Sequence, residues 1–142
     1  MYLLKWLLLV LSAIELLPLT RLWALQEQPC DVSLFIAPRH SNDDVKVLLT
    51  LFLSTMVVLR FVGFARGAAM SLPEKWGLIV AHAMEAVLMG TLYRANVLPR
   101  RHVLPSLKRI EVDVIMGFIA VNPWLLLLLR TSEGSSSKSK AE

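Results

Sequence analysis

The sequence predicts an all-α, polytopic membrane protein with about four transmembrane helices, and three observations lead to this fold class. Of the 142 residues, 56% are hydrophobic and 18% are charged. The mean hydropathy is +0.59. The polar residues gather in short stretches between long apolar runs, which is typical of helices that cross a bilayer. A soluble domain of this length needs a polar exterior, and this composition does not supply one.

The first apolar segment covers residues 3–25, which is long enough to cross a bilayer core of about 30 Å at about 1.5 Å per residue. Trp6 and Trp23 lie near its two ends, where tryptophan anchors a helix at the membrane interface. The polar stretch 26–44 that follows predicts a loop. Its apolar middle, residues 32–37, is expected to lie on the membrane surface.

A cleaved signal peptide is the alternative interpretation of this first segment. Lys5 then forms the charged region and residues 6–14 the apolar region. However, Glu15 and Arg21 closely follow the apolar run, and no clear site with small residues for cleavage comes after it. These features favour a helix that is retained in the membrane.

The second and third apolar segments cover residues 45–65 and 76–93. Both are long enough to span, the third with little tilt. The turn between them contains Ser71, with Glu74 three residues later. This spacing predicts a capping box, in which Ser71 caps the start of the third helix and Glu74 binds back to it.

The fourth apolar segment covers residues 112–129, after a strongly basic loop at 94–111. One transmembrane domain, residues 1–130, is therefore expected to contain four spans at about 3–25, 45–65, 76–93 and 112–129. The remaining tail, residues 131–142, is polar and rich in serine, and we expect it to be disordered.

The charge distribution does not indicate a nucleic-acid-binding protein. It also does not predict which way the protein is oriented in the membrane. The net charge is +4 and the pI about 9.6, but the basic residues flank apolar segments, where they meet lipid headgroups. We expect membrane lipid, and no nucleic acid, as a partner. Lys and Arg are divided almost evenly between the two sides of a four-span protein, so the positive-inside rule does not choose between them.

The carboxyl end resembles an address for the endoplasmic reticulum. Lys138 and Lys140 are the fifth and third residues from the end, as in the K-x-K-x-x retrieval signal of reticulum membrane proteins. Such a signal is read by a receptor on the cytosolic side. It predicts that both termini are cytosolic. The alternative is a low-complexity tail that happens to contain two lysines.

Five polar residues fall inside the apolar segments: Glu15, Arg60, His82, Glu85 and Asn122. Ionisable groups inside a membrane cost several kcal/mol unless they are paired or hydrated, so these residues are the candidate contacts. His82 and Glu85 are three residues apart and lie on one helix face. Arg60 either extends to the interface or pairs with Glu15 or Glu85 in the bundle. The carboxyl groups either hold helices together, contact a ligand or partner, or act in catalysis.

No established catalytic, cofactor or metal motif accompanies these residues. The sequence has no glycine-rich phosphate loop, no Ser-His-Asp set and no H-E-x-x-H motif. One histidine and one glutamate are too few ligands for a metal site. The single cysteine, Cys30, cannot form an intramolecular disulfide. We therefore predict no catalytic residue, no cofactor and no bound metal.

Three stretches resemble the ergosterol biosynthetic protein 28 family over about 100 residues. The start, MYLLKWLLLVLSAIELL, is similar to that family's first helix, and residues 48–61 (LLTLFLSTMVVLRF) to its second. Residues 78–94 (LIVAHAMEAVLMGTLYR) resemble its third helix, with His82 and Glu85 in the positions of a histidine and a glutamate. The chain departs from the family in three ways: DDVKVLL replaces an Arg-Thr-Phe-Gly-like motif, the histidine-to-glutamate spacing is one residue shorter, and the basic loop is longer.

This resemblance implies a non-catalytic scaffold in the endoplasmic reticulum membrane, which tethers enzymes of sterol C-4 demethylation to one another. Its partners would then be membrane-bound enzymes of sterol biosynthesis. Two other functions stay open. One is an intramembrane lipid enzyme of the sterol-isomerase type, with Glu15, His82 and Glu85 as acid-base groups and Trp124 as a cation-stabilising face. The other is an accessory subunit of a complex in the mitochondrial inner membrane. The sequence does not specify an oligomeric state.

Overall fold

The computed structural model describes residues 2–33 and 35–128, and all regular elements in these ranges are helices. The long ones are α1 (Tyr2–Trp23), α3 (Asp43–Arg66), α4 (Leu72–Leu92) and α5 (Ser106–Leu126). The short ones are α2 (Pro29–Val32), η1 (Pro38–His40), η2 (Gly67–Ala69), η3 (Tyr93–Val97) and η4 (Leu98–Val103). The predicted all-α fold class is confirmed for this part of the chain.

Three stretches of the described chain are long and apolar enough to cross a membrane: Trp6–Trp23, Asp43–Arg66 and Leu72–Val103. They correspond to the first three predicted segments. The first two turns of α5 instead carry four charged side chains: Lys108, Arg109, Glu111 and Asp113. This charged start shortens the apolar part of α5. Leu129, the end of the predicted fourth span, lies outside the described residues, as does the tail with Lys138 and Lys140.

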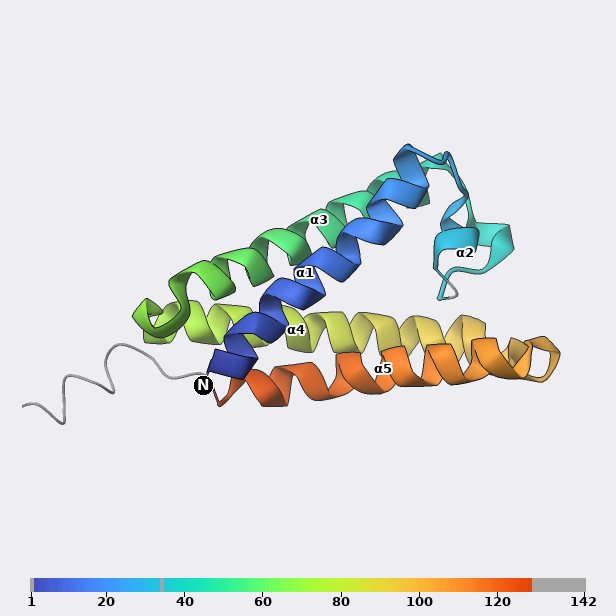
Figure 1. Ribbon diagram of the computed structural model, residues 1–142. Coiled ribbons are helices and arrows are strands. Elements are labelled where there is room, and N and C mark those ends of the chain that lie inside the picture. The colour runs from blue at the N-terminus through green and yellow to red at the C-terminus, as the bar shows by residue number, and fades with distance from the viewer. Residues whose placement is uncertain (1, 34, 129–142) are drawn as a thin grey trace, which may run out of the picture.

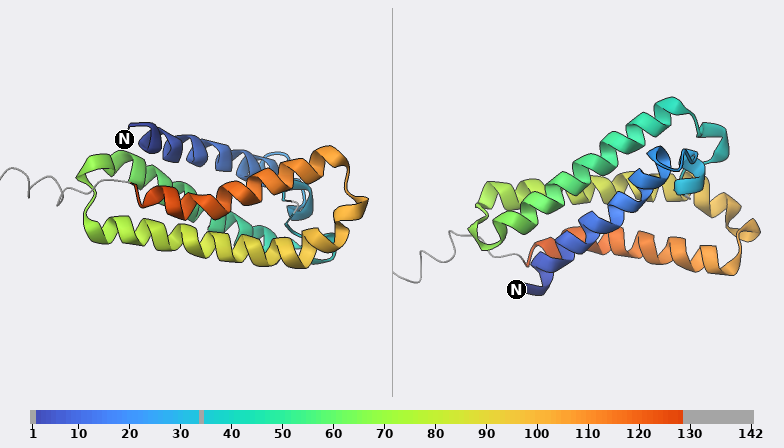
Figure 2. Two further views of the ribbon diagram at one scale, coloured as in Figure 1. Left: turned by 90° about the horizontal axis from the view of Figure 1, so that it is seen from below. Right: turned by 45° about the horizontal axis from the view of Figure 1, so that its top comes forward.

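The four long helices form two antiparallel pairs, α1 with α3 and α4 with α5 (Figure 1). The pairs meet near the turn between α3 and α4 and diverge towards the other end, as a second direction of view also shows (Figure 2). At the closed end, a buried apolar cluster joins the two pairs: Leu8, Met70, Leu78, Ile79 and Leu126. The start of α1 and the end of α5 lie at this closed end.

Local sequence explains where α3 and α4 begin. The Asn42 side chain accepts a hydrogen bond from the Val45 backbone N–H at 2.9 Å, which caps α3. At α4, the Ser71 hydroxyl accepts from the Glu74 N–H at 3.4 Å and the Glu74 carboxylate accepts from the Ser71 N–H at 2.7 Å. The predicted capping box is therefore confirmed. Gly67, with a φ of 48°, follows the last residue of α3 in a conformation that other residues rarely adopt.

The sequence led us to expect a loop at the basic stretch 94–111, but the structure shows no loop there. This stretch forms η3, η4 and the first turns of α5. Charged residues suggested a loop, but here they lie on an exposed helical turn, where Lys108 and Glu111 form an ion pair at 2.8 Å. Side chains three residues apart are neighbours on a helix, so such a pair supports the turn rather than breaking it.

The apolar middle of the loop between α1 and α3 is also placed differently from our expectation. Phe35 is only 6% exposed and belongs to a buried cluster with Met89 of α4 and Val112 of α5. The Asn96 side chain donates a hydrogen bond to the Phe35 carbonyl at 2.9 Å. This stretch therefore folds back against the open end of the bundle instead of lying on the membrane surface, because protein contacts bury its apolar side chains.

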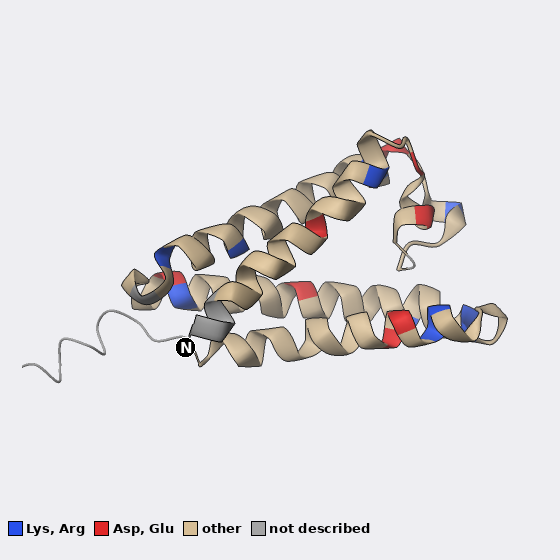
Figure 3. Cartoon of the chain, viewed as in Figure 1, with Lys and Arg blue, Asp and Glu red and all other residues tan. Residues whose placement is uncertain are grey.

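The outer faces of the long helices are apolar. Large hydrophobic side chains are at least two-thirds exposed on several helices, for example Met84, Val87 and Trp124. Lys, Arg, Asp and Glu gather mostly near the helix ends (Figure 3). A soluble monomer rarely exposes such continuous apolar surface, whereas a membrane protein presents it to lipid.

We expect Gly63→Leu to lower the thermal unfolding midpoint of the purified protein. Gly63 lies in α3 where three elements meet, and a Cβ atom there would stand 3.0 Å from Leu78 Cδ2 and 3.1 Å from Leu8 Cδ1. A larger side chain must push these helices apart, at a cost of about 1–3 kcal/mol. Tryptophan fluorescence during heating in detergent measures the change. Gly77→Leu is the matched control, because a Cβ at Gly77 meets no atom within 4 Å. Equal midpoints for the two variants would contradict close packing at Gly63.

Candidate functional site

Arg60 is the centre of a buried group of ionisable side chains. It lies in the last third of α3, six residues before Arg66, and is only 3% exposed. Its Nη2 donates to both carboxylate oxygens of Glu85 in α4, at 2.9 and 2.7 Å. Its Nη1 pairs with Glu15 Oε1 of α1, and its Nε donates to His82 Nε2 of α4 at 2.8 Å. One guanidinium therefore connects three helices, because its planar fork presents several donors in fixed directions.

The contacts of His82 determine its tautomer. A guanidinium N–H can only donate, so His82 Nε2 must accept from Arg60. The other ring nitrogen, Nδ1, then carries the proton and donates to the Leu78 carbonyl at 2.8 Å. His82 is therefore the neutral Nδ1–H tautomer. With 0% exposure and both nitrogens bound, it orients the Arg60 side chain and is shielded from the surface.

The two carboxyl groups of this site are not equivalent. Glu85 uses both oxygens to bind Arg60. Glu15 uses Oε1 for Arg60, while its Oε2 is buried and has no hydrogen-bond partner in the described chain. One guanidinium thus faces two carboxyl groups, and one acceptor is left over. A buried acceptor without a donor is costly, so a further hydrogen-bond donor that reached this oxygen would stabilise the site.

Sequence reasoning missed Ser12 as a member of this polar interior. Ser12 is 4% exposed and its hydroxyl lies 2.9 Å from the Leu8 carbonyl and 3.3 Å from the Val57 carbonyl of α3. It lies three residues before Glu15, so both face α3. That spacing was the available signal, but a single serine is too common in apolar helices to stand out.

Of the five candidate residues, the structure brings four together: Glu15, Arg60, His82 and Glu85. Asn122 is separate from these hydrogen bonds. It is 2% exposed in α5, and its Oδ1 has no hydrogen-bond partner among the described residues.

A second group of polar side chains stabilises the connection between α4 and α5, at the open end of the bundle. The Tyr93 hydroxyl donates to Asp113 Oδ1 at 2.7 Å, and Arg101 pairs with the same carboxylate. These side chains are partly exposed, so the contacts contribute less than those of Arg60. They connect η3 and η4 to Asp113 at the start of α5.

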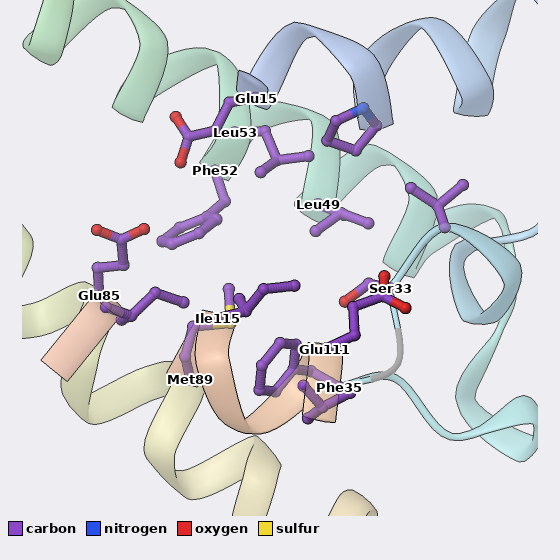
Figure 4. Close-up of a pocket in the computed structure, with 14 residues that line it drawn as sticks. Glu15, Ser33, Phe35, Leu49, Phe52, Leu53, Glu85, Met89, Glu111 and Ile115 are labelled. Carbon is purple, nitrogen blue, oxygen red and sulfur yellow. The ribbon is translucent and has the colours of Figure 1, made fainter. Parts of the chain in front are cut away.

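A cavity of about 190 Å³ lies beside the Arg60 group, between the two diverging helix pairs. Glu15 and Glu85 border it at one end, and Ser33 and Glu111 at the other (Figure 4). The walls between these ends are apolar: Leu49, Phe52, Leu53, Met89 and Ile115. The cavity is partly open to the surroundings. The angle between the helix pairs creates it, which is why the sequence did not predict it.

Within the described residues, no group of three or more His, Cys, Asp or Glu side chains is arranged to hold a metal ion. No protein-family model matches the sequence, and no curated protein or solved structure matches it either. The resemblance to the ergosterol biosynthetic protein 28 family therefore rests on the sequence stretches that suggested it.

Proposed function

We propose that this protein is a non-catalytic scaffold or accessory protein of the endoplasmic reticulum membrane, which binds membrane-bound enzymes of sterol biosynthesis. The observation that carries this proposal is the use of the intramembrane ionisable groups. Arg60 binds Glu15, His82 and Glu85 at once and so joins α1, α3 and α4. This supports a structural role for residues that would otherwise be candidate acid-base catalysts.

The contacts of the site make the intramembrane enzyme a weaker proposal. General acid-base catalysis needs a group that can reach the substrate. Both nitrogens of His82 and both oxygens of Glu85 are already bound within the protein. Trp124, the suggested cation-stabilising residue, is 70% exposed on the outside of α5. These positions do not place His82, Glu85 and Trp124 around one substrate.

Four transmembrane helices are part of the proposal. α5 has 21 residues, as many as α4, and packs antiparallel to it. Its later part exposes apolar side chains such as Phe118 and Val121, as a lipid-facing helix does. This arrangement supports a fourth span, and it would return the chain to the side where α1 starts.

The apolar outer faces supply the surface for partner helices. Exposed side chains such as Leu48 of α3 and Val87 of α4 belong to faces that no other described element covers. In a membrane, such faces contact either lipid or the helices of another protein. A chain that consists almost wholly of helices with these faces suits a protein that holds membrane enzymes together.

We expect the protein to co-purify with sterol-biosynthetic enzymes from reticulum membranes. An internal tag after Glu27, in the connection between α1 and α2, leaves the carboxyl end free, and purification in mild detergent with mass spectrometry identifies the partners. Lys138→Ser with Lys140→Ser should move the protein out of the reticulum, because the receptor reads both lysines. Ser137→Ala with Ser139→Ala is the matched control and should leave the location unchanged. Recovery of respiratory-complex subunits would overturn the proposal and favour the mitochondrial alternative.

A further inference from the structure

We propose that the cavity between the helix pairs binds a membrane lipid whose head group donates a hydrogen bond and carries no negative charge. The head group donates to Glu15 Oε2, and the apolar body lies between the walls of the cavity. This site is separate from the scaffold function, because its ligand enters the bundle rather than covering an outer face.

The unpartnered carboxylate oxygen carries the first step. Glu15 Oε2 is buried and has no hydrogen-bond partner in the described chain, while Oε1 is held by Arg60. The pairing with Arg60 holds Glu15 at the border of the cavity (Figure 4). Oε2 itself has almost no accessible surface, so the Glu15 side chain must turn towards the cavity when the ligand enters. A ligand hydroxyl or amine that then donates to Oε2 removes the cost of leaving this acceptor unsatisfied.

The lining determines the charge of the ligand. The titratable side chains that border the cavity are all acidic: Glu15, Glu85 and Glu111. They come from α1, α4 and α5, so carboxyl groups face the cavity from three directions. Arg60 and Lys108 pair with these carboxyl groups, but neither cation lines the cavity. A negatively charged head group such as a fatty acid carboxylate therefore meets carboxyl groups and no cationic partner in the lining. An uncharged hydroxyl or a protonated amine needs no cationic partner, and both can donate to Oε2.

The size and position of the cavity determine the rest of the ligand. Pockets that enclose a drug-sized molecule have volumes of roughly 300–1,000 Å³. The cavity here is about 190 Å³ and partly open, so it holds the head-group end and the adjoining part of a lipid. The walls, including Phe52, Met89 and Ile115, are apolar. The remainder of the lipid extends through the open side towards the bilayer.

Photolabelling of the full-length protein in phosphatidylcholine nanodiscs tests this site. The probe is hexadecanol with a diazirine close to its hydroxyl group. Mass spectrometry should find the label on cavity residues such as Met89 and Ile115. Unlabelled hexadecanol and hexadecylamine should compete for this labelling, and hexadecyl methyl ether, which cannot donate, should compete about tenfold less well. Palmitate should not compete.

A matched pair of variants checks the position of the ligand. Ile115→Trp places a larger side chain in the cavity and should reduce labelling about tenfold. Ile110→Trp makes the same change on the same helix at a residue that is 60% exposed and does not line the cavity, so its labelling should stay at the wild-type level. Thermal midpoints establish that both variants are folded. If Ile115→Trp does not fold, the competition by hexadecanol and by its methyl ether on the wild-type protein tests whether the cavity binds a hydrogen-bond donor. Absence of label from the cavity, or equal competition by the ether, would overturn the proposal.

Discussion

Replacing Arg60 with methionine is expected to remove most of the folded protein from the membrane. The variant keeps a long, unbranched side chain but removes every donor that binds Glu15, Glu85 and His82. Two carboxyl groups are then left in an apolar interior without a counter-charge. Breaking a buried ion pair by removing one partner costs about 3–5 kcal/mol, and the whole stability of a typical protein is about 5–15 kcal/mol. The fraction of monodisperse protein extracted in mild detergent, and its thermal midpoint, measure the loss.

Two further variants separate this effect from a general loss of charge. Arg66→Met removes an arginine from the same helix, but Arg66 is about half exposed and pairs with Glu74 at 3.2 Å at the surface. It should change stability by less than about 1 kcal/mol. Adding Glu15→Gln and Glu85→Gln to Arg60→Met should restore a large part of the folded protein, because no unpaired charge then remains inside. Wild-type stability of Arg60→Met alone would show that the Arg60 contacts do not hold the helices together.

The members of this site could be predicted from the sequence, but their pairing could not. Glu15, Arg60, His82 and Glu85 stand out because a charged or polar residue inside an apolar segment is costly and needs a partner. The spacing of three residues also placed His82 and Glu85 on one face of α4. Whether Arg60 reaches the interface or the bundle centre depends on how α3 is rotated and packed. The structure places it at 3% exposure between three helices, which only tertiary contacts determine.

Helix positions followed from the sequence wherever a local signal was present. Ser71 and Glu74 predicted the start of α4 correctly, because the capping box is formed by residues three apart. The start of α5 at Ser106 was missed, since Lys108 and Arg109 are typical of a loop when only hydrophobicity is considered. The position of Phe35 was missed for another reason. Its burial depends on Met89 and Val112, more than 50 residues further along the chain, and no local pattern shows such a contact.

Cysteine labelling is expected to place the tail on the same side of the membrane as the turn between α3 and α4. Four single cysteines in a Cys30→Ser background suffice: Gln28→Cys, Pro73→Cys, His102→Cys and Ser135→Cys. The first three positions are exposed at the two opposite ends of the bundle. In sealed, cytosol-side-out reticulum vesicles, a membrane-impermeant maleimide should label cysteines 73 and 135 before detergent is added, and cysteines 28 and 102 only afterwards. The difference should be nearly all-or-none, because the reagent cannot cross the apolar core.

The position of the tail cysteine discriminates between the two places that α5 can take. If α5 crosses the membrane, cysteine 135 must label together with cysteine 73. If α5 lies along the surface because of its charged first turns, cysteine 135 must label together with cysteine 102, and the protein has three spans. Asp113 is bound to Arg101 and Tyr93 beside η4, and Lys108 pairs with Glu111. Three of the four charged side chains at the start of α5 therefore have a partner of opposite charge at one end of the bundle, and the apolar part of α5 is free to enter the bilayer. We therefore expect the four-span pattern. If cysteines 28 and 102 label before detergent, and cysteines 73 and 135 only afterwards, the protein has four spans in the reverse orientation, which would exclude a cytosolic retrieval signal at Lys138 and Lys140.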